Sequence, residues 1–215
     1  MAKIGYLMLK GGHWQGQQIV SRNWVKKSTR PHIKAGGYEY GYQWWRGQTI
    51  VNNRVIDAFW AWGHGGQYIL VIPALDLVVV LTAKHRENPG YSERAFNMLT
   101  RYIIPAVTPS RPPGTTVAVK PKVLEAYVGT YTFKHDKGTE TVNIILKANK
   151  LYGSGDDGEI VELYPETENR FYGTSKYMGG IKLQFVKNQK GDVANMIAHV
   201  APQFAFMRIP FGKIE

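Results

Sequence analysis

The chain has 215 residues and no cysteine, which excludes disulfides, thiol catalysis and thiolate metal ligands. With 44% hydrophobic and 13% aromatic residues it is expected to fold, and no apolar run approaches the ~18 residues that a membrane span needs. The net charge of +11 would suit a nucleic acid or an anionic cell envelope, but the basic residues are scattered, which favours a solvated surface with no nucleic-acid partner.

The first 31 residues predict two short helices. Residues 2–10 have helical apolar spacing and end at Gly11, which suits a left-handed cap. No Ser, Asp or Asn precedes this helix, which indicates either a frayed terminus or a chain cut from a longer protein. Ser21 is expected to cap the second helix, and Pro31 is expected to end it.

A series of strands follows and leads to the most apolar part of the chain. Residues 38–45 and 55–62 predict strands, with a turn over 47–53 between them. The run from Val71 to Leu81 predicts two adjacent strands that meet near Pro73, the second of them covered on both sides.

A helix, a linker and a barrel complete the predicted organisation. Ser92 is expected to cap a helix that ends before Pro105. The segment 108–121 is rich in proline and predicts a linker, so residues 1–107 and 122–215 are expected to form separate domains. Short alternating runs between turn residues predict that the second domain is a small antiparallel β-barrel. The predicted fold class is therefore α+β, with a helix-packed antiparallel sheet followed by the barrel.

His64 is the best candidate for chemistry, because it lies among glycines in Trp62-Gly-His-Gly-Gly-Gln67 at the end of a predicted strand. Neutral imidazole can shuttle a proton, and imidazolium can bind a carboxylate. Glycines allow backbone N–H groups to point at a developing oxyanion. The alternative is a structural histidine beside a glycine-rich hairpin, and spacing alone does not decide between the two.

Three segments carry a resemblance to a known family through their motifs, their order and their spacing. They are Met1-Ala-Lys-Ile-Gly-Tyr-Leu-Met-Leu, Tyr40-Gly-Tyr-Gln-Trp-Trp45, and Trp62-Gly-His-Gly-Gly-Gln-Tyr-Ile-Leu-Val-Ile-Pro-Ala-Leu-Asp-Leu-Val-Val-Val80. Together they resemble the C-terminal part of the serine β-lactamase and penicillin-binding-protein superfamily, in its class C-like branch. The later segment Tyr127-Val-Gly-Thr-Tyr131 resembles the small lipocalin-like β-barrel domains appended to such hydrolases.

The resemblance implies a role for the glycine-rich stretch. The third motif of that superfamily is Lys-Thr-Gly or, in esterase-like members, His-x-Gly. Here His64 would bind a substrate carboxylate or support the proton network, and the backbone N–H of Gln67, or that of Tyr68, would form half of an oxyanion hole. The candidate catalytic residues are therefore His64, Gly66 and Gln67, and the candidate substrate-binding residues are Gly65, Tyr68 and Trp44. Packing in a core is the alternative for the tryptophans.

The sequence also departs from the family pattern. No serine has lysine three residues later, and no Tyr-x-Asn is present, so the nucleophile and base of the family are missing. The chain is therefore expected to be a fragment of a hydrolase for β-lactams, D-alanyl peptides or small esters, inactive alone and completed by a missing N-terminal segment or another copy. The alternative is a non-catalytic module that binds cell-envelope material or glycans.

Further expectations concern partners and location. An apolar face left without its N-terminal partner predicts self-association. No cofactor is expected, and no metal site either, because the other histidines lie far apart without metal-ligand spacing. The resemblance suggests the cell envelope or secretion, although no signal peptide is indicated.

Overall fold

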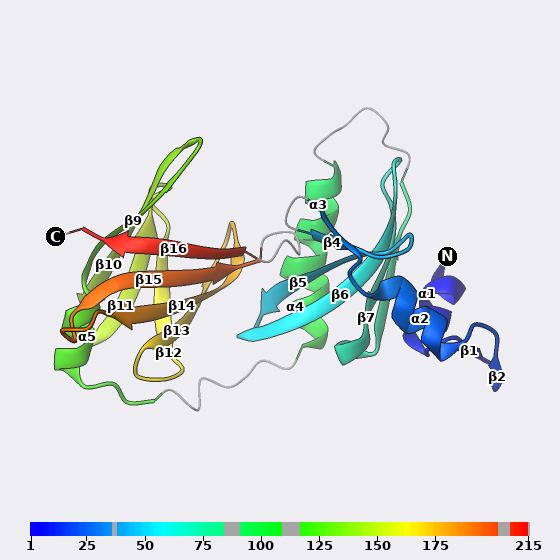
Figure 1. The fold of residues 1–215 in the computed structure, drawn as a ribbon, viewed down its shortest axis with the longest axis horizontal. Coiled ribbons are helices and arrows are strands. Elements are labelled where there is room, and N and C mark those ends of the chain that lie inside the picture. Colours follow the sequence, from blue (N-terminus) through cyan, green and yellow to red (C-terminus); the bar gives the residue numbers. More distant parts are fainter. Residues whose placement is uncertain (36–37, 84–90, 109–116, 202–206, 215) are drawn as a thin grey trace. The chain divides into compact units, whose positions relative to one another are not determined.

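The computed structural model describes residues 1–35, 38–83, 91–108, 117–201 and 207–214, which belong to two units. Unit 1 lies within Met1–Pro109, and unit 2 lies within Ser110–Ala201 and Met207–Glu215. The described parts of both units combine antiparallel strands with a few helices, so the fold is a mixed α and β one (Figure 1).

Unit 1 is built on an antiparallel sheet whose strands are neighbours in the order of the sequence, because each pairs with the next (Figure 1). In the described part of the chain these strands are β3 (Ile33–Ala35), β4 (Tyr38–Tyr40), β5 (Trp45–Val51), β6 (Arg54–Gly63), β7 (Gln67–Ile72) and β8 (Leu77–Leu81). A two-stranded ribbon, β1 (His13–Trp14) with β2 (Gln17–Gln18), precedes them.

Helical segments share a core with each face of this sheet. Met8 of α1 (Ala2–Leu9) and Val25 of α2 (Arg22–Thr29) cluster with Ile69 of β7. Phe96 of α3 (Tyr91–Met98) clusters instead with Tyr68, which is the neighbour of Ile69 along β7. The two clusters lie on opposite faces, because successive side chains of a strand point to opposite sides of the sheet.

Two local signals in the sequence are confirmed. The Trp24 backbone N–H donates to Ser21 Oγ at 3.2 Å, so Ser21 caps α2. Gly11 has a φ of +63°, and the Gly12 N–H donates to the Leu7 carbonyl at 2.8 Å, so a left-handed glycine ends α1.

The predicted turn over 47–53 is wrong. Trp45–Val51 is a strand, and the turn consists only of Asn52 and Asn53, whose φ values are +49° and +62°. Val51 pairs with Arg54, so this is a two-residue hairpin of the kind that asparagine favours. Gln43, with a φ of +66°, also interrupts the strand expected over 38–45.

The better-covered strand of the predicted pair is the first one. Residues 68–72 of β7 are buried, whereas all five side chains of β8 are only half-buried. The reason is position, since β7 lies between two strands and β8 lies at the edge of the sheet. A short 3₁₀ turn, Pro73–Leu75, joins them.

The helix after the sheet does not end before Pro105. A π-helical turn, Leu99–Ile103, follows α3 and leads into α4 (Ile104–Val107), which contains Pro105. Proline has no N–H to donate and clashes with the carbonyl four residues earlier, and the wider π turn accommodates both defects. Ser92 lies inside α3 rather than before it, and its side chain is outside the described part of the chain.

Unit 2 is a closed antiparallel barrel preceded by a short helix, α5 (Pro121–Tyr127) (Figure 1). Its eight strands, within the described residues, are β9 (Gly129–His135), β10 (Gly138–Lys147), β11 (Lys150–Gly155), β12 (Ile160–Pro165), β13 (Arg170–Ser175), β14 (Gly179–Lys187), β15 (Val193–Val200) and β16 (Met207–Lys213). The sequence indicated the first seven of these strands. It missed β16 and α5.

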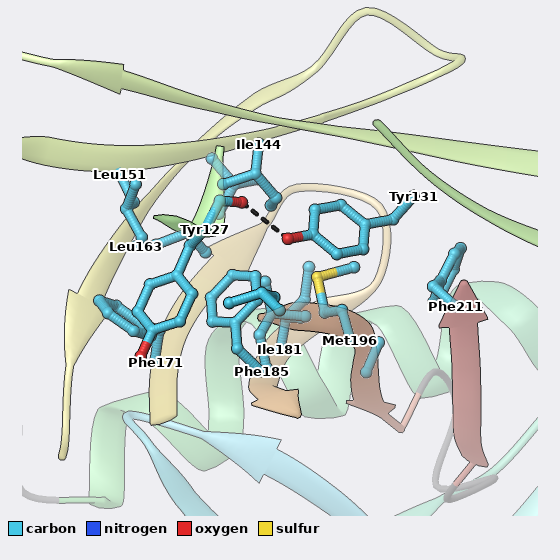
Figure 2. Close-up of a cluster of buried hydrophobic side chains, with 14 of the residues drawn as sticks. Tyr127, Tyr131, Ile144, Leu151, Leu163, Phe171, Ile181, Phe185, Met196 and Phe211 are labelled. Atoms are coloured by element: carbon cyan, nitrogen blue, oxygen red, sulfur yellow. Dashed lines mark hydrogen bonds between the residues drawn. The ribbon is translucent and has the colours of Figure 1, made fainter. Parts of the chain in front are cut away.

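Aromatic side chains fill the end of the barrel that α5 covers (Figure 2). The Tyr127 ring, fully buried, stacks on Phe185 at 4.2 Å between centroids and meets Phe171 edge-on. Its hydroxyl donates to the Glu168 carbonyl in the turn between β12 and β13. Tyr131, also fully buried, donates its hydroxyl to the Tyr127 carbonyl at 2.8 Å. The helix is thus fixed to the barrel by rings and by two hydrogen bonds.

Candidate functional site

The glycine-rich stretch forms the turn between β6 and β7. The Gly66 N–H donates to the Gly63 carbonyl at 3.0 Å, and Gly63 pairs with Gln67 across the hairpin. Gly66 has a φ of +86°, a conformation that side chains with a Cβ adopt only with strain. This is the geometry of a three-residue hairpin loop with a left-handed last residue.

The other two glycines make room for the side chain of Gln67. A Cβ atom on Gly63 would lie 2.6 Å from Gln67 Oε1, and one on Gly65 would lie 2.6 Å from Gln67 Nε2. The Gln67 amide also donates to the Ala83 carbonyl, which follows β8. The Gln67 side chain therefore braces the turn against the end of the neighbouring strand. The glycine pattern has a structural explanation in addition to the chemical one inferred from the sequence.

The structure brings four of the six candidate residues together. His64 is exposed in the turn, next to Gly65, Gly66 and Gln67. Tyr68 is 1% exposed and stacks on Trp62 at 6.0 Å, so it presents its backbone rather than its ring to the turn.

Trp44 is not part of this group. It is 8% exposed and packs edge-on against Phe59, in the cluster that contains residues of α1 and α2. Tyr68 belongs to the cluster on the opposite face of the sheet. Trp44 and Tyr68 therefore do not line one site in unit 1.

Three other tryptophans follow one face of the sheet. Trp45 lies 6.1 Å from Trp62 between ring centroids, and Trp60 contacts Phe96 edge-on at 5.7 Å. Only Trp62, 47% exposed, offers substantial aromatic surface in this row. In the described residues, no group of three potential ligand side chains forms a metal site.

A concave feature that the sequence analysis did not locate lies inside the barrel. It is a cavity of about 330 Å³. Its wall is apolar, with contributions from Val161, Leu163, Met196, Ala198 and Phe211. Gly153 also lines it, and a Cβ atom there would be 3.8 Å from Ile144 Cδ1 and from Leu163 Cδ1, an ordinary contact. Gly153 therefore leaves volume empty that a side chain would fill.

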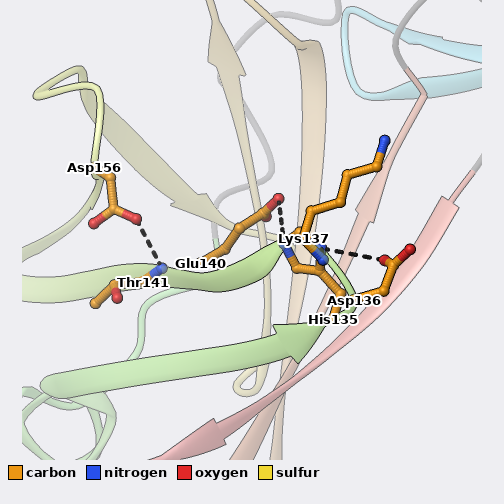
Figure 3. Close-up of polar contacts among 6 residues, drawn as sticks. All are labelled: His135, Asp136, Lys137, Glu140, Thr141 and Asp156. Carbon is orange, nitrogen blue, oxygen red and sulfur yellow. Dashed lines mark hydrogen bonds and ion pairs between the residues drawn. The ribbon is translucent and has the colours of Figure 1, made fainter.

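The residues that line this cavity include four with carboxylate side chains, and Figure 3 shows the contacts of two of them, Glu140 and Asp156. The Asp156 carboxylate accepts from the Thr141 N–H at 3.1 Å, and Glu140 lies 3.6 Å from His135 Nε2. Asp157 accepts from the Glu159 N–H at 3.0 Å. These bonds hold the turn between β11 and β12 beside the start of β10.

Glu159 links this turn to the next one at the same end. Its two oxygens accept from Ser175 Oγ and from the Lys176 N–H, both at 2.6 Å. Ser175, 3% exposed, accepts in turn from the backbone N–H groups of Tyr177 and Met178 at 3.0 Å. The Lys176 ammonium group lies 4.6 Å from the centroid of the Tyr177 ring. The acidic end of the cavity is thus an ordered arrangement.

Burial changes several pKa values in unit 2, among them those of Tyr131 and His199. It raises the pKa of the Tyr131 phenol well above its ordinary value, and the nearby Tyr127 phenol adds to the effect. Burial lowers the pKa of His199, and the charges of Arg208, Arg170 and Lys182 lower it further. Neither residue lines the cavity.

Comparison with known proteins identifies no family. No family model and no curated protein match the sequence. Among solved structures, the chain is similar to SurE with D-Leu at 15% identity and a TM-score of 0.36, covering 91% of this chain and 44% of that one. It is also similar to the octameric penicillin-binding protein homologue from Pyrococcus abyssi, at 17% identity and a TM-score of 0.33, covering 96% of this chain and 44% of that one. The chain spans less than half of either, and a TM-score below 0.5 does not define a fold.

No helix among the described residues has the length and apolar character required to cross a membrane.

Proposed function

We propose that unit 1 supplies one wall of the active site of a β-lactamase-like serine hydrolase, and that the chain has no acyl-transfer activity by itself. The observation that carries the proposal is the turn between β6 and β7, where His64 is exposed beside backbone held by Gly63 and Gly66. An exposed imidazole can bind a substrate carboxylate there, and the backbone N–H of Gln67 is the proposed oxyanion donor.

The nucleophile would come from another segment or from another chain. The sequence holds no Ser-x-x-Lys, and an oxyanion donor stabilises nothing without a covalent intermediate. The substrates proposed for the assembled enzyme are β-lactams, D-alanyl peptides or small esters, and the proposed location is the cell envelope or the exterior.

The first experiment assays the purified chain with nitrocefin, a p-nitrophenyl ester and a fluorophosphonate probe. We expect neither turnover nor labelling. Turnover that disappears in a His64→Ala variant would show that the chain is a complete enzyme and would contradict the proposal.

The second experiment supplies the proposed nucleophile. The reading frame immediately upstream of the Met1 codon is sequenced, and the chain is expressed together with any segment that encodes Ser-x-x-Lys. We expect hydrolysis by the joined protein and a fall of about ten-fold or more in kcat/KM with His64→Ala, because a positioned acid–base group contributes ~10²–10⁴-fold. Val55→Ala, at an exposed position of β6, is the matched control, with no expected effect. An inactive joined protein, or a frame without the motif, would count against the proposal.

A further inference from the structure

The interior of the barrel is divided into a filled half and a hollow half. Successive turns of an antiparallel barrel lie at alternate ends, so the turns β11–β12 and β13–β14 share one end and the turn β12–β13 lies at the other. The α5 helix covers the second end, since Tyr127 donates to Glu168 there. The cavity lies toward the first end, where Asp156, Asp157 and Ser175 line it.

Several of the residues that line the hollow half are small or flexible. They include Gly153, Met196 and Ala198, which point into the barrel. The filled half instead holds the large rings of Phe171 and Phe185. An eight-stranded barrel is just wide enough for side chains to fill it or for one small ligand to occupy it. The volume of about 330 Å³ is roughly twice the ~150 Å³ that accepts benzene, so it suits about two rings or a chain of about eight carbons.

The charges at the end of the cavity that Asp156 and Asp157 line select the polar group of such a ligand. The described residues that line the cavity include four carboxylates and no basic side chain, in a chain whose net charge is +11. The four are Glu140, Asp156, Asp157 and Glu159. A basic neighbour, Lys176, lies against the ring of Tyr177. An apolar interior with a carboxylate rim complements a molecule that has an apolar body and a cationic end.

We propose that the barrel of unit 2 binds a small cationic amphiphile, with its apolar body in the cavity beside Gly153 and its ammonium or similar group among the carboxylates at the rim. The proposal is independent of the hydrolase function, because it uses residues of unit 2 alone.

The test uses three probes of equal length, n-octylammonium, n-octanol and n-octanoate, titrated calorimetrically into the full chain at pH 7 and about 10 mM salt. We expect the order octylammonium, octanol, octanoate, with about ten-fold between the first and the last, since exposed charge pairs contribute modestly. At about 150 mM salt the Debye length falls from ~30 Å to ~8 Å, so the preference should shrink while octanol binding stays constant. Failure of all three probes to bind would overturn the proposal.

Two variants that would fill the cavity test whether the probes bind inside it. Gly153→Leu and, from another strand, Ala198→Leu should each abolish binding of all three probes. Thr174→Leu is the matched control, because Thr174 is exposed on β13 and the same apolar side chain there points away from the interior. Circular dichroism establishes that each variant folds, and two independent variants keep the test decisive if one does not. Binding that survives in a folded filled variant would overturn the proposal.

Two double variants test the preference of the cavity for a cationic ligand. Asp156→Asn/Asp157→Asn keeps an oxygen for each backbone N–H bond but removes two charges, so the affinity for octylammonium should fall about three-fold or more while that for octanol stays the same. Glu168→Gln/Asp192→Asn changes the total charge equally in exposed turns at the opposite end of the barrel and should have no effect. Equal effects of the two double variants, or no order among the three probes, would refute the cationic specificity.

Discussion

Replacing Tyr131 with Phe tests how α5 is held on the barrel. The Tyr131 hydroxyl donates to the Tyr127 carbonyl at 2.8 Å, and both residues are fully buried. Tyr131→Phe keeps the ring but leaves that carbonyl without its donor in a place that water does not reach. An unsatisfied buried group costs about 1–3 kcal/mol, which corresponds to about 4–8 °C of Tm for each kcal/mol in a domain of this size.

The assay must report the two units separately. All six tryptophans lie between positions 14 and 62, so tryptophan fluorescence during urea unfolding follows unit 1 and should not change. Unit 2 is followed by hydrogen exchange of peptides from β9 and β14, which should lose protection. Tyr172→Phe, on a half-exposed ring that stacks on Tyr164, is the matched control and should cost less than about 0.5 kcal/mol.

The pH dependence supplies a second readout. Because burial raises the pKa of Tyr131 in the folded state, the unfolded chain loses this proton first as the pH rises above about 10. The wild type then loses stability through Tyr131 and the Phe variant does not, so the difference in unfolding free energy between them should narrow above pH 10. A cost below about 0.5 kcal/mol at pH 7, or a difference that widens above pH 10, would refute the reasoning.

Three further predictions concern single positions. Gly66→Ala should destabilise unit 1 by about 1–2 kcal/mol in urea unfolding followed by tryptophan fluorescence, because the φ of Gly66 is +86°. Gly66→Asn should cost less, and equal costs for the two variants would contradict the left-handed geometry. Ser21→Ala should cost about 1 kcal/mol by the same measurement, since Trp24 loses its cap, whereas Ser21→Asp should cost little. The lowered pKa of His199 means that unit 2 loses stability as the pH falls below about 6.5, where the unfolded chain gains a proton first. His199→Gln should remove this loss in hydrogen exchange measured at pH 7 and pH 5, and an unchanged profile would show that other groups cause it.

Self-association, expected from the sequence, stays a prediction. Large apolar side chains are exposed in unit 1, among them Ile4, Trp24 and Trp62. Light scattering at micromolar concentration should detect an oligomer, and a monomer would contradict the expectation.

Local patterns in the sequence determined much of the secondary structure. Ser21 and Gly11 act through bonds to residues within five positions, so their roles as caps follow from the sequence alone. The hairpin between β6 and β7 follows likewise from glycines between two apolar runs. The related segments Asn-Lys-Leu-Tyr-Gly153 and Asn-Arg-Phe-Tyr-Gly173 begin β11 and β13, each with a large inward residue followed by an inward glycine. Only Gly153 lines the cavity, whereas a Cβ atom on Gly173 would lie 2.6 Å from Val161 Cγ1, so this shared pattern does not predict space inside the barrel.

The tertiary structure alone decided the rest, because it depends on residues far apart in the chain. Pro210 argues against a strand, yet β16 closes the barrel by pairing with β15 and, through Gly212 and Lys213, with β9 about 80 residues earlier. The exposure of β8 depends on its place at the sheet edge, and the separation of Trp44 from Tyr68 depends on the two faces of the sheet. The described residues that make the cavity and its acidic rim come from seven strands and their turns, so no local pattern in the sequence contains them.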